Sequence, residues 1–560
     1  MPFTFSVRAL RFLVLGALLS ASACGGDDSP QDPGSVAAGA GQSSGSSGAA
    51  GATATNAGSA NVAGAGVAGA SNPSGGTAGS LLGAGAGGSA PIAGSAGATV
   101  GNGGRTGSAA GSGGAGGGAA GSAQAGAGGA VVLPPSVTSL FPAPNSTGVC
   151  NDAPLSITFS TKPTLGATGK IAVFAQSNPN TAIDTVDLAT DKITDTIGGQ
   201  LRNEVRPVFI DGNQAVVYFH QHKLSANTRY FVTVSSGAFL DSAKAAIGTV
   251  SGSSTWSFTT GAAATASASM TVDRTGAGPL CTVQGAFDAI PASNSALRTI
   301  TIKKGTYHEI LYLNGKQNLT LHGEDRAATV IAYPNNDLLN AGTSGRGLFF
   351  ANNTTGLVIE NLTIYNTTPQ GGSQAEALRV QADQVILRNA NFKSLQDTLL
   401  LTGRVYVVNS YIDGNVDFVW GNGVTYFDKC EIKTVGRAGA IVQSRNAAGY
   451  GYVFVDSKLT SDAGITGQVL ARIDATAYPQ SHVAFINCQM SSAIAAKGWT
   501  ITPAGTTQTG SLRFWEYQST DANGALLNVS GRDPASKQIT AAQAATMRDK
   551  VTVLAGWNPQ

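Results

Sequence analysis

The sequence predicts an all-β protein in which a β-sandwich precedes a right-handed parallel β-helix. Short strand-like runs recur six times between residues 357 and 490, each with a polar residue at the same place. Residues 134–262 hold other short runs of β-branched and aromatic residues, separated by Pro, Gly and Asn. Residues 24–133 are mostly Gly, Ala and Ser and cannot bury a core, which predicts a disordered tether. A chain of 560 residues is long enough for two domains.

The recurring run is the main structural signal after residue 268. We call its polar position the slot residue; the slot residues are 361, 389, 409, 429, 456 and 487. Short strands at an irregular period, with length variation in the connecting loops, are typical of the stacked coils of a parallel β-helix. The alternative, a second β-sandwich, would require hairpin turns at closer intervals. We therefore predict one β-helix over residues 268–560.

Two aspartates occupy equivalent places in consecutive repeats. Asp397 and Asp417 each follow a slot residue by eight positions. Neighbouring coils would place them about 4.8 Å apart. Two carboxylates at that distance do not readily both ionise, so the pair would supply one acid and one nucleophile or base. A single Asp would be explained as a turn residue, but two in register beside Gln, Phe and Trp favour a catalytic site.

Four motifs in the same order resemble those of the pectin methylesterases, or pectinesterases, which are β-helical carbohydrate esterases. They are Gly-Thr-Tyr-His-Glu at 305–309, Gln-Ala-Glu-Ala-Leu at 374–378, Gln-Asp-Thr-Leu at 396–399 and Gly-Asn-Val-Asp-Phe-Val-Trp-Gly at 414–421. The resemblance extends from about Met270 to Pro559. It implies a monomeric enzyme that hydrolyses the methyl esters of pectin, methyl-esterified homogalacturonan, to free carboxylates and methanol without a metal or other cofactor.

The resemblance also implies a role for each matching residue. Asp417 matches the family's nucleophile, and Asp397 matches its general acid, which later acts as the base on water. Gln374 and Gln396 match the amides of the family's oxyanion hole. Arg472, in Leu-Ala-Arg-Ile-Asp, matches the arginine that holds the nucleophile, a role that suits a planar guanidinium.

The chain departs from the family after Arg472, because the Pro and Trp that follow the family's arginine are absent. Trp420 and Tyr478 are the candidates for the aromatic surface that would face a sugar ring, and both could equally be core residues. Gln443, in Gln-Ser-Arg, resembles a family stretch near the cleft and is predicted to bind substrate.

Two other functions remain open. Carboxylates about 5 Å apart would also suit a retaining glycosidase, another kind of β-helical polysaccharide enzyme. A non-catalytic surface module that binds polysaccharide would need only a groove and aromatic residues. The two glutamines and Arg472 favour the esterase, since a glycosidase needs no oxyanion hole.

The first 23 residues are predicted to be an export signal. Arg8 and Arg11 precede the short apolar stretch 12–19, and Ala-Ser-Ala-Cys at 21–24 resembles a bacterial lipobox. We expect a lipid on Cys24 and a location at the cell envelope, with membrane contact only through that anchor. Cleavage after Ala23 and secretion is the alternative. A formal net charge of +2 argues against a nucleic-acid partner.

The segment 134–262 resembles bacterial Ig-like domains, particularly at Leu224–Tyr230 and at the closing Trp-Ser-Phe-Thr-Thr of 256–260. Its role, as a spacer or as a module that contacts carbohydrate, stays open. A helix is predicted over Thr540–Leu554, where it would cover an end or a flank of the β-helix.

The cysteines divide into two pairs and Cys24. Cys430 and Cys488 follow slot residues that are two coil steps apart, which puts their Cα atoms roughly 9–10 Å from each other, too far for a disulfide. We expect them to be buried free thiols. Cys150 and Cys281 could pair across the domain boundary.

Overall fold

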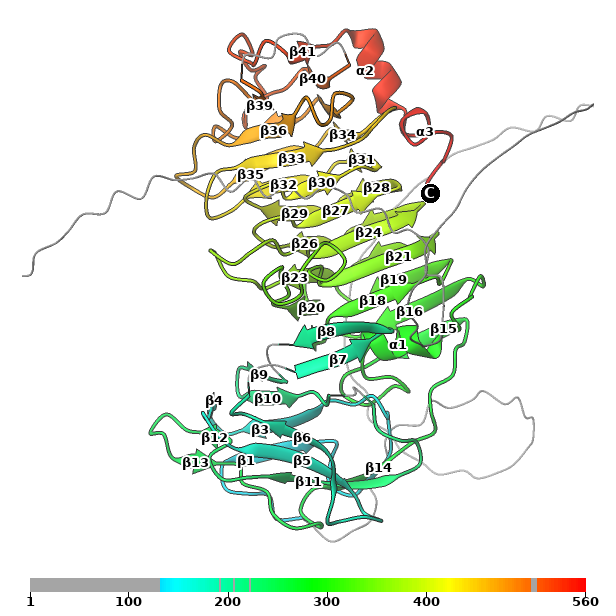
Figure 1. The fold of residues 1–560 in the computed structure, drawn as a ribbon, viewed down its shortest axis with the longest axis vertical. Coiled ribbons are helices and arrows are strands. Elements are labelled where there is room, and N and C mark those ends of the chain that lie inside the picture. Colours follow the sequence, from blue (N-terminus) through cyan, green and yellow to red (C-terminus); the bar gives the residue numbers. More distant parts are fainter. Residues whose placement is uncertain (1–130, 191–192, 205–206, 221–222, 505–510) are drawn as a thin grey trace, which may run out of the picture. The chain divides into compact units, whose positions relative to one another are not determined.

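The computed structural model describes residues 131–190, 193–204, 207–220, 223–504 and 511–560 (Figure 1). The predicted signal peptide, Cys24 and all but the last three residues of the predicted tether lie outside these residues. None of the helices in the described part has the length and apolar character needed to span a bilayer. The all-β prediction is confirmed, since only three short helices accompany the strands.

The N-terminal described part is a β-sandwich. One sheet has the order β1-β3-β10-β9, a second has β2-β14-β11-β5-β6, and a small third has β13-β12-β4. The bounds are β1 (Val137–Phe141), β2 (Ser146–Val149), β3 (Leu155–Phe159), β4 (Thr164–Leu165), β5 (Lys170–Ala175), β6 (Ala182–Asp187), β9 (Val208–Asp211), β10 (Gln214–Val217), β11 (Arg229–Val234), β12 (Phe239–Leu240), β13 (Ala246–Ile247) and β14 (Ser257–Thr260). A separate hairpin consists of β7 (Ile193–Ile197) and β8 (Gln200–Glu204).

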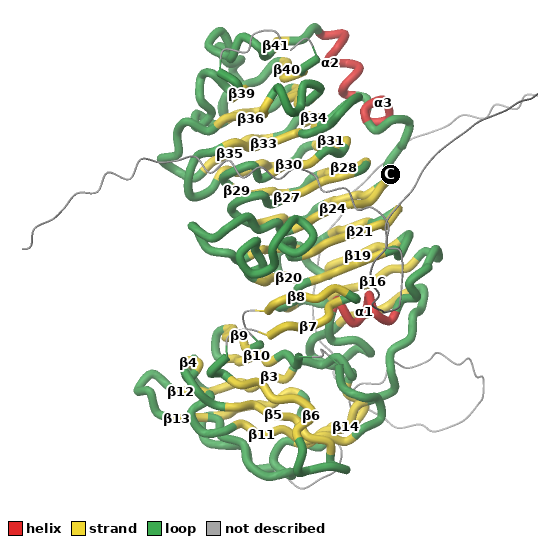
Figure 2. The backbone as a smooth tube through the Cα atoms, in the orientation of Figure 1, coloured by secondary structure: helices red, strands yellow, loops and turns green. Residues whose placement is uncertain are grey.

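The rest of the chain forms the predicted parallel β-helix, whose strands stack coil upon coil (Figure 2). It has three parallel sheets, which we call sheets I, II and III. Sheet I contains β15 (Ser269–Val272), β16 (Arg298–Ile302), β19 (Leu319–Gly323), β22 (Val358–Glu360), β25 (Val385–Arg388), β28 (Arg404–Val408), β31 (Val424–Asp428), β34 (Tyr452–Val455), β37 (His482–Ile486), β40 (Arg513–Tyr517) and β41 (Lys537–Gln538).

Sheets II and III alternate along the chain with sheet I. Sheet II contains β17 (Gly305–Tyr307), β20 (Thr329–Tyr333), β23 (Thr363–Asn366), β26 (Asn391–Lys393), β29 (Tyr411–Gly414), β32 (Glu431–Thr434), β35 (Lys458–Ser461) and β38 (Gln489–Met490). Sheet III contains β18 (Leu311–Asn314), β21 (Phe349–Thr355), β24 (Leu378–Asp383), β27 (Leu399–Thr402), β30 (Val419–Gly421), β33 (Ala440–Ser444), β36 (Val469–Asp474) and β39 (Trp499–Thr502).

The slot residues make the turn from sheet I to sheet II. All six have a left-handed backbone, with φ between 47° and 57°. Asn and Asp tolerate this conformation better than most residues because their short side chains can bond to nearby backbone. Asn389 also donates to the Oδ1 of Asn361, the slot residue one coil earlier, at 3.0 Å. The recurring polar residue therefore marks a turn that every coil repeats.

The interior of the β-helix is apolar and stacked by register. Phe427, Phe454 and Phe485 lie on successive strands of sheet I, with ring centroids 4.2 and 4.7 Å apart. Cys430 and Cys488 are buried free thiols, as predicted. Each coil adds one layer to this core. The position of a turn along the axis of the β-helix therefore depends on the number of coils that precede it.

Three helices lie against the sheets. In α1 (Val283–Ala289) the first backbone N–H groups donate to the carboxylate of Glu309, which is therefore structural. The predicted C-terminal helix is present as α2 (Ala541–Arg548), with a capping box at Thr540, followed by α3 (Lys550–Val553). Their apolar side chains pack on the outer face of sheet I, so they cover a flank of the β-helix.

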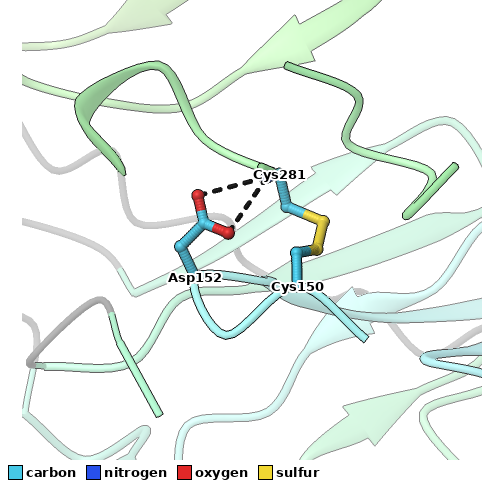
Figure 3. Close-up of side chains that lie close together, drawn as sticks. All are labelled: Cys150, Asp152 and Cys281. Carbon is cyan, nitrogen blue, oxygen red and sulfur yellow. Dashed lines mark hydrogen bonds between the residues drawn. A yellow bond between two sulfur atoms is a disulfide. The ribbon is translucent and has the colours of Figure 1, made fainter. Parts of the chain in front are cut away.

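A disulfide joins the sandwich to the β-helix. Cys150 and Cys281 are bonded, with Cα atoms 6.0 Å apart, as the sequence suggested. Beside them the buried carboxylate of Asp152 accepts the backbone N–H of Cys281 (Figure 3). It also accepts the backbone N–H and the hydroxyl of Thr282. Burial raises the pKa of Asp152. The two parts are thus connected covalently and by hydrogen bonds.

Candidate active site

The two aspartates lie in stacked turns between sheets II and III. Asp397 follows β26 and Asp417 follows β29, and the Asp397 N–H donates to the Val416 carbonyl at 3.0 Å. Both residues have a left-handed backbone, with φ of 68° and 48°, and both are buried. The structure therefore brings together the pair that the repeat register predicts.

Asp417 is held by Arg472. The arginine extends from β36, and its Nε donates to both carboxylate oxygens at 2.7 and 2.9 Å, while its Nη2 donates to Oδ2. A planar guanidinium that spans a carboxylate fixes its orientation as well as its charge. This is the contact expected from the Leu-Ala-Arg-Ile-Asp motif.

Asp397 belongs to a different, buried ion network. Arg346 donates from Nη2 to Asp397 Oδ2 at 3.0 Å and from Nε to both oxygens of Glu376 at 2.9 and 3.1 Å. Burial raises the pKa of Asp397 well above its ordinary value, the Glu376 and Asp417 carboxylates raise it further, and Arg346 opposes the rise. Burial raises the pKa of Glu376 as well, so one guanidinium faces two buried carboxyl groups that both bind a proton more tightly than usual.

The two predicted oxyanion glutamines enter the same region from successive coils. Gln374 precedes β24 and Gln396 precedes β27, and the Ala375 N–H donates to the Gln396 carbonyl at 3.2 Å. The Ser373 hydroxyl donates to Gln374 Oε1 at 2.5 Å, which uses the acceptor end of that amide. Both side chains are partly buried. They therefore lie in turns directly adjoining the two aspartates.

The predicted substrate-binding residues surround an arginine. Trp420 and Gln443 are register partners on β30 and β33. Arg445 donates to Gln443 Oε1 at 2.7 Å from Nη2, and its guanidinium lies 4.9 Å from the Trp420 ring centre and 5.5 Å from that of Tyr478. Trp420 is only 6% exposed, whereas Tyr478 is half-buried. Of the two aromatic candidates, Tyr478 offers the more accessible ring.

Sequence reasoning gave no role to Arg346, Glu376 or Arg445. Glu376 stood inside the Gln-Ala-Glu-Ala-Leu motif, where a charge between apolar residues of a buried run signals an ionic partner. Arg346 lies between two glycines just ahead of β21. The two partners are 30 positions apart, so no local motif in the sequence reveals the pair.

Within the described residues, one group has the spacing of metal ligands: Cys150, Asp152 and Cys281. Both sulfur atoms of that group form the disulfide, so neither is a thiolate that could coordinate a metal. The aspartate pair is held by guanidinium groups instead.

Family models match both parts of the chain. The model described as Pectinesterase matches residues 269–547, and that described as Bacterial Ig-like domain matches residues 132–260. Among solved structures, the deglycosylated pectin methylesterase from Aspergillus niger is similar with 26% identity and a TM-score of 0.44, over 52% of this chain and 95% of that one.

Curated proteins similar to this chain are also described as pectinesterases. Pectinesterase 31 of Arabidopsis thaliana is 31% identical over 205 residues, which are 34% of this chain and 64% of that protein, less than two thirds of its length. Probable pectinesterase 67 of the same plant is 30% identical over 247 residues, 41% of this chain and 69% of that protein. The chain therefore belongs to the pectinesterase family and carries a bacterial Ig-like domain ahead of its pectinesterase part.

Proposed function

We propose that the protein is a pectinesterase that hydrolyses the methyl esters of pectin to free carboxylates and methanol. The observation that supports this most directly is the different setting of the two aspartates. Asp417 is held through both oxygens by Arg472, whereas burial raises the pKa of Asp397 within a buried ion network. One in-register pair thus provides a nucleophile and an acid.

In the first step the Asp417 carboxylate attacks the carbonyl carbon of the methyl ester. The negative charge that develops on the carbonyl oxygen accepts hydrogen bonds from the side-chain amides of Gln374 and Gln396. Collapse of this intermediate breaks the bond to the methoxy oxygen, which takes the proton of Asp397 and leaves as methanol. An acyl group remains on Asp417.

In the second step Asp397, now ionised, accepts a proton from a water molecule that attacks the acyl carbon. The bond to Asp417 breaks, which restores the nucleophile and releases a carboxylic acid that loses its proton to solvent to give the new carboxylate. Asp397 has regained its proton, so both groups return to their starting states. Arg472 keeps the Asp417 carboxylate oriented at the start and at the end of the cycle.

The test is methanol release from methyl-esterified pectin by the full chain and by Asp417→Asn. We expect the variant to lose several orders of magnitude in turnover with its melting temperature nearly unchanged, because no other group can form the acyl intermediate. Asp521→Asn, which removes a carboxylate from a turn after β40, is the matched control and should keep full activity.

Near-normal methanol release by Asp417→Asn would contradict the assignment of the nucleophile. If the wild-type chain released reducing sugar ends and no methanol, the retaining glycosidase would replace the esterase. Binding of pectin without either product would instead indicate a polysaccharide-binding module.

The proposed location follows from the N-terminal sequence alone. We propose export and attachment to the cell envelope by a lipid on Cys24, with pectin as the external substrate. The Ala-Ser-Ala-Cys stretch supports lipidation. The Cys24→Ala variant would then leave the membrane fraction.

A further inference from the structure

The β7–β8 hairpin, which lies within the Ig-like segment of the chain, contacts the β-helix. Gly198 and Gly199 form its two-residue turn, both with positive φ, the signature of a tight hairpin. Ile197 is buried in the core cluster of the β-helix. A Cβ atom placed on Gly198 would lie 2.7 Å from the Tyr312 carbonyl oxygen on β18, so the tip fits closely against sheet III. Figure 1 shows the hairpin beside α1 and β18.

The second strand of the hairpin is bonded to the segment 335–346, which we call the arginine loop because it ends at Arg346. The Asn203 N–H donates to Asn340 Oδ1 at 2.8 Å, and Asn340 Nδ2 donates back to the Asn203 carbonyl at 2.9 Å. Asn203 Nδ2 also donates to the Leu339 carbonyl at 3.0 Å. The buried Arg202 donates to the Ser344 carbonyl at 2.6 Å.

The other side of the arginine loop forms part of the candidate active site. The Asp337 N–H donates to the carbonyl of Gln374 at 3.0 Å, and Arg346 donates to Glu376 and Asp397. Leu339, whose carbonyl meets the hairpin, is buried, whereas the neighbouring Leu338 is 81% exposed. Hydrogen bonds to the hairpin and to the site hold opposite sides of the loop, and Asn335 braces it internally by donating to the carbonyls of Gly345 and Gly347.

We propose that Arg202 and Asn203 of the β7–β8 hairpin are positioning residues, which hold the arginine loop so that Arg346 stays against Asp397. The inference rests on the proposed function, because it concerns the surroundings of Asp397, the general acid of that reaction. Through these two residues the Ig-like segment helps to position the active site. A misplacement of about 1 Å in a catalytic contact can cost on the order of 10²-fold in rate.

The pH dependence of the reaction reports the contact between Arg346 and Asp397, since five charged groups surround Asp397. Glu376 and Asp417 favour its protonated form, while Arg346, Arg445 and Arg472 favour the ionised form. If the arginine loop becomes more mobile and Arg346 moves away from Asp397, Asp397 will keep its proton to higher pH. The fall in kcat/KM on the alkaline side should then move to higher pH, an effect that loss of stability alone would not produce.

The experiment compares the full chain with Arg202→Ala/Asn203→Ala. We expect kcat for methanol release to fall at least tenfold, KM to change less than twofold, and the alkaline limb to move to higher pH. Arg202→Lys should recover part of kcat, because it keeps one donor toward Ser344. Gln200→Ala, at an exposed position on the same strand, is the matched control and should behave as wild type.

Hydrogen exchange of residues 335–346 gives a second readout that does not depend on activity. Exchange should be faster in the double variant and normal in Gln200→Ala. Unchanged exchange together with an unchanged kcat would overturn the proposal. A wild-type chain that releases no methanol would refute the proposed function alone, and the exchange data would still decide whether the hairpin holds the loop. If the double variant does not fold, Asn203→Ala, which loses only the contact to Leu339 and the bond from Thr194, takes its place.

Discussion

At the residue scale, two aspartates with the same turn conformation have different chemistry because their partners differ. Among the described residues, Arg472 forms an ion pair with Asp417 alone, whereas Asp397 shares Arg346 with the fully buried Glu376. Both aspartates are buried, so the difference comes from the ratio of positive to negative groups around each carboxyl group. Residue type alone would assign the same role to both aspartates.

The first prediction concerns the pH dependence of the reaction. The pKa of Asp397 is raised, so the proton that the leaving methoxide needs is present below that pKa and is lost as the pH rises through it. Glu376→Gln removes a neighbouring negative charge, which lowers the pKa of Asp397. The alkaline limb of kcat/KM should therefore move to lower pH in this variant; a limb that stays in place would contradict the role of Asp397.

The second prediction concerns the oxyanion donors. Gln374→Ala and Gln396→Ala each remove one amide from the proposed hole, and such losses typically cost about 10²–10³ in kcat. KM for pectin and the melting temperature should change little. Gln489→Ala, whose side chain bonds to the Ala522 carbonyl near the C-terminal end, is the control. If either site variant retained wild-type kcat, that amide would not bind the oxyanion.

At the scale of the element, turns of the β-helix place polar residues where the backbone has a positive φ. Between sheets II and III the chain buries carboxylates instead of exposing them, and Asp413 on β29 is a further example. Burial raises its pKa to about 6, although Lys393 and the Ser394 N–H stabilise the charged form. The folded protein therefore binds this proton more tightly than the unfolded chain does.

The third prediction follows from that linkage. Between about pH 4 and pH 6 the folded state holds more protons at Asp413, so stability falls as the pH rises through this window and levels off above it. Asp413→Asn should raise the free energy of unfolding at pH 7 by up to about 3 kcal/mol, given a shift of about two units, and by little at pH 4.

Asp462→Asn is the matched control with the opposite sign. Its side chain bonds to Lys433 and to the Gly436 N–H, and the Lys433 bond is the main cause of its lowered pKa. The charged form thus stabilises the fold above the ordinary Asp pKa, and that stability is lost as the pH falls. Urea unfolding at pH 4 and pH 7 measures both variants; equal shifts at the two pH values would contradict the assignment.

At the scale of the whole molecule, the Ig-like part and the β-helix are joined at several places. The disulfide and the Asp152 contacts lie at one place, and the β7–β8 hairpin contacts the arginine loop at another. His308 of the β-helix also stacks on Phe209 of the sandwich, with ring centres 4.0 Å apart. These contacts connect the Ig-like part to both the core and the candidate active site of the β-helix.

The fourth prediction concerns the disulfide. It closes a loop across 131 positions, and loss of a disulfide that closes a loop of this size typically costs about 2–5 kcal/mol of stability. Reductant should lower the melting temperature of the wild-type chain. Cys150→Ala/Cys281→Ala should show the same lowering without reductant and no further change with it. A wild-type melting temperature that reductant does not affect would contradict a stabilising role.

The sequence by itself determined the coils, the slot turns and the register of the two aspartates. Each of these depends on a short run of residues: apolar alternation makes a strand, and a residue that tolerates positive φ makes the turn. Because every coil repeats the run, equivalent positions such as Asp397 and Asp417 must stack. The predicted pairs Asp417–Arg472 and Cys150–Cys281 were also found, through a family motif and through cysteine pairing respectively.

Only the tertiary structure decided which arginine holds Asp397 and what holds that arginine in turn. Arg346 is 51 residues from Asp397, and Asn203 is 137 residues from Asn340. The place where the β7–β8 hairpin contacts the arginine loop could not be predicted from the sequence either. Contacts of this kind depend on how many coils have formed and on the path of each loop between them, and no local pattern of residues encodes either quantity.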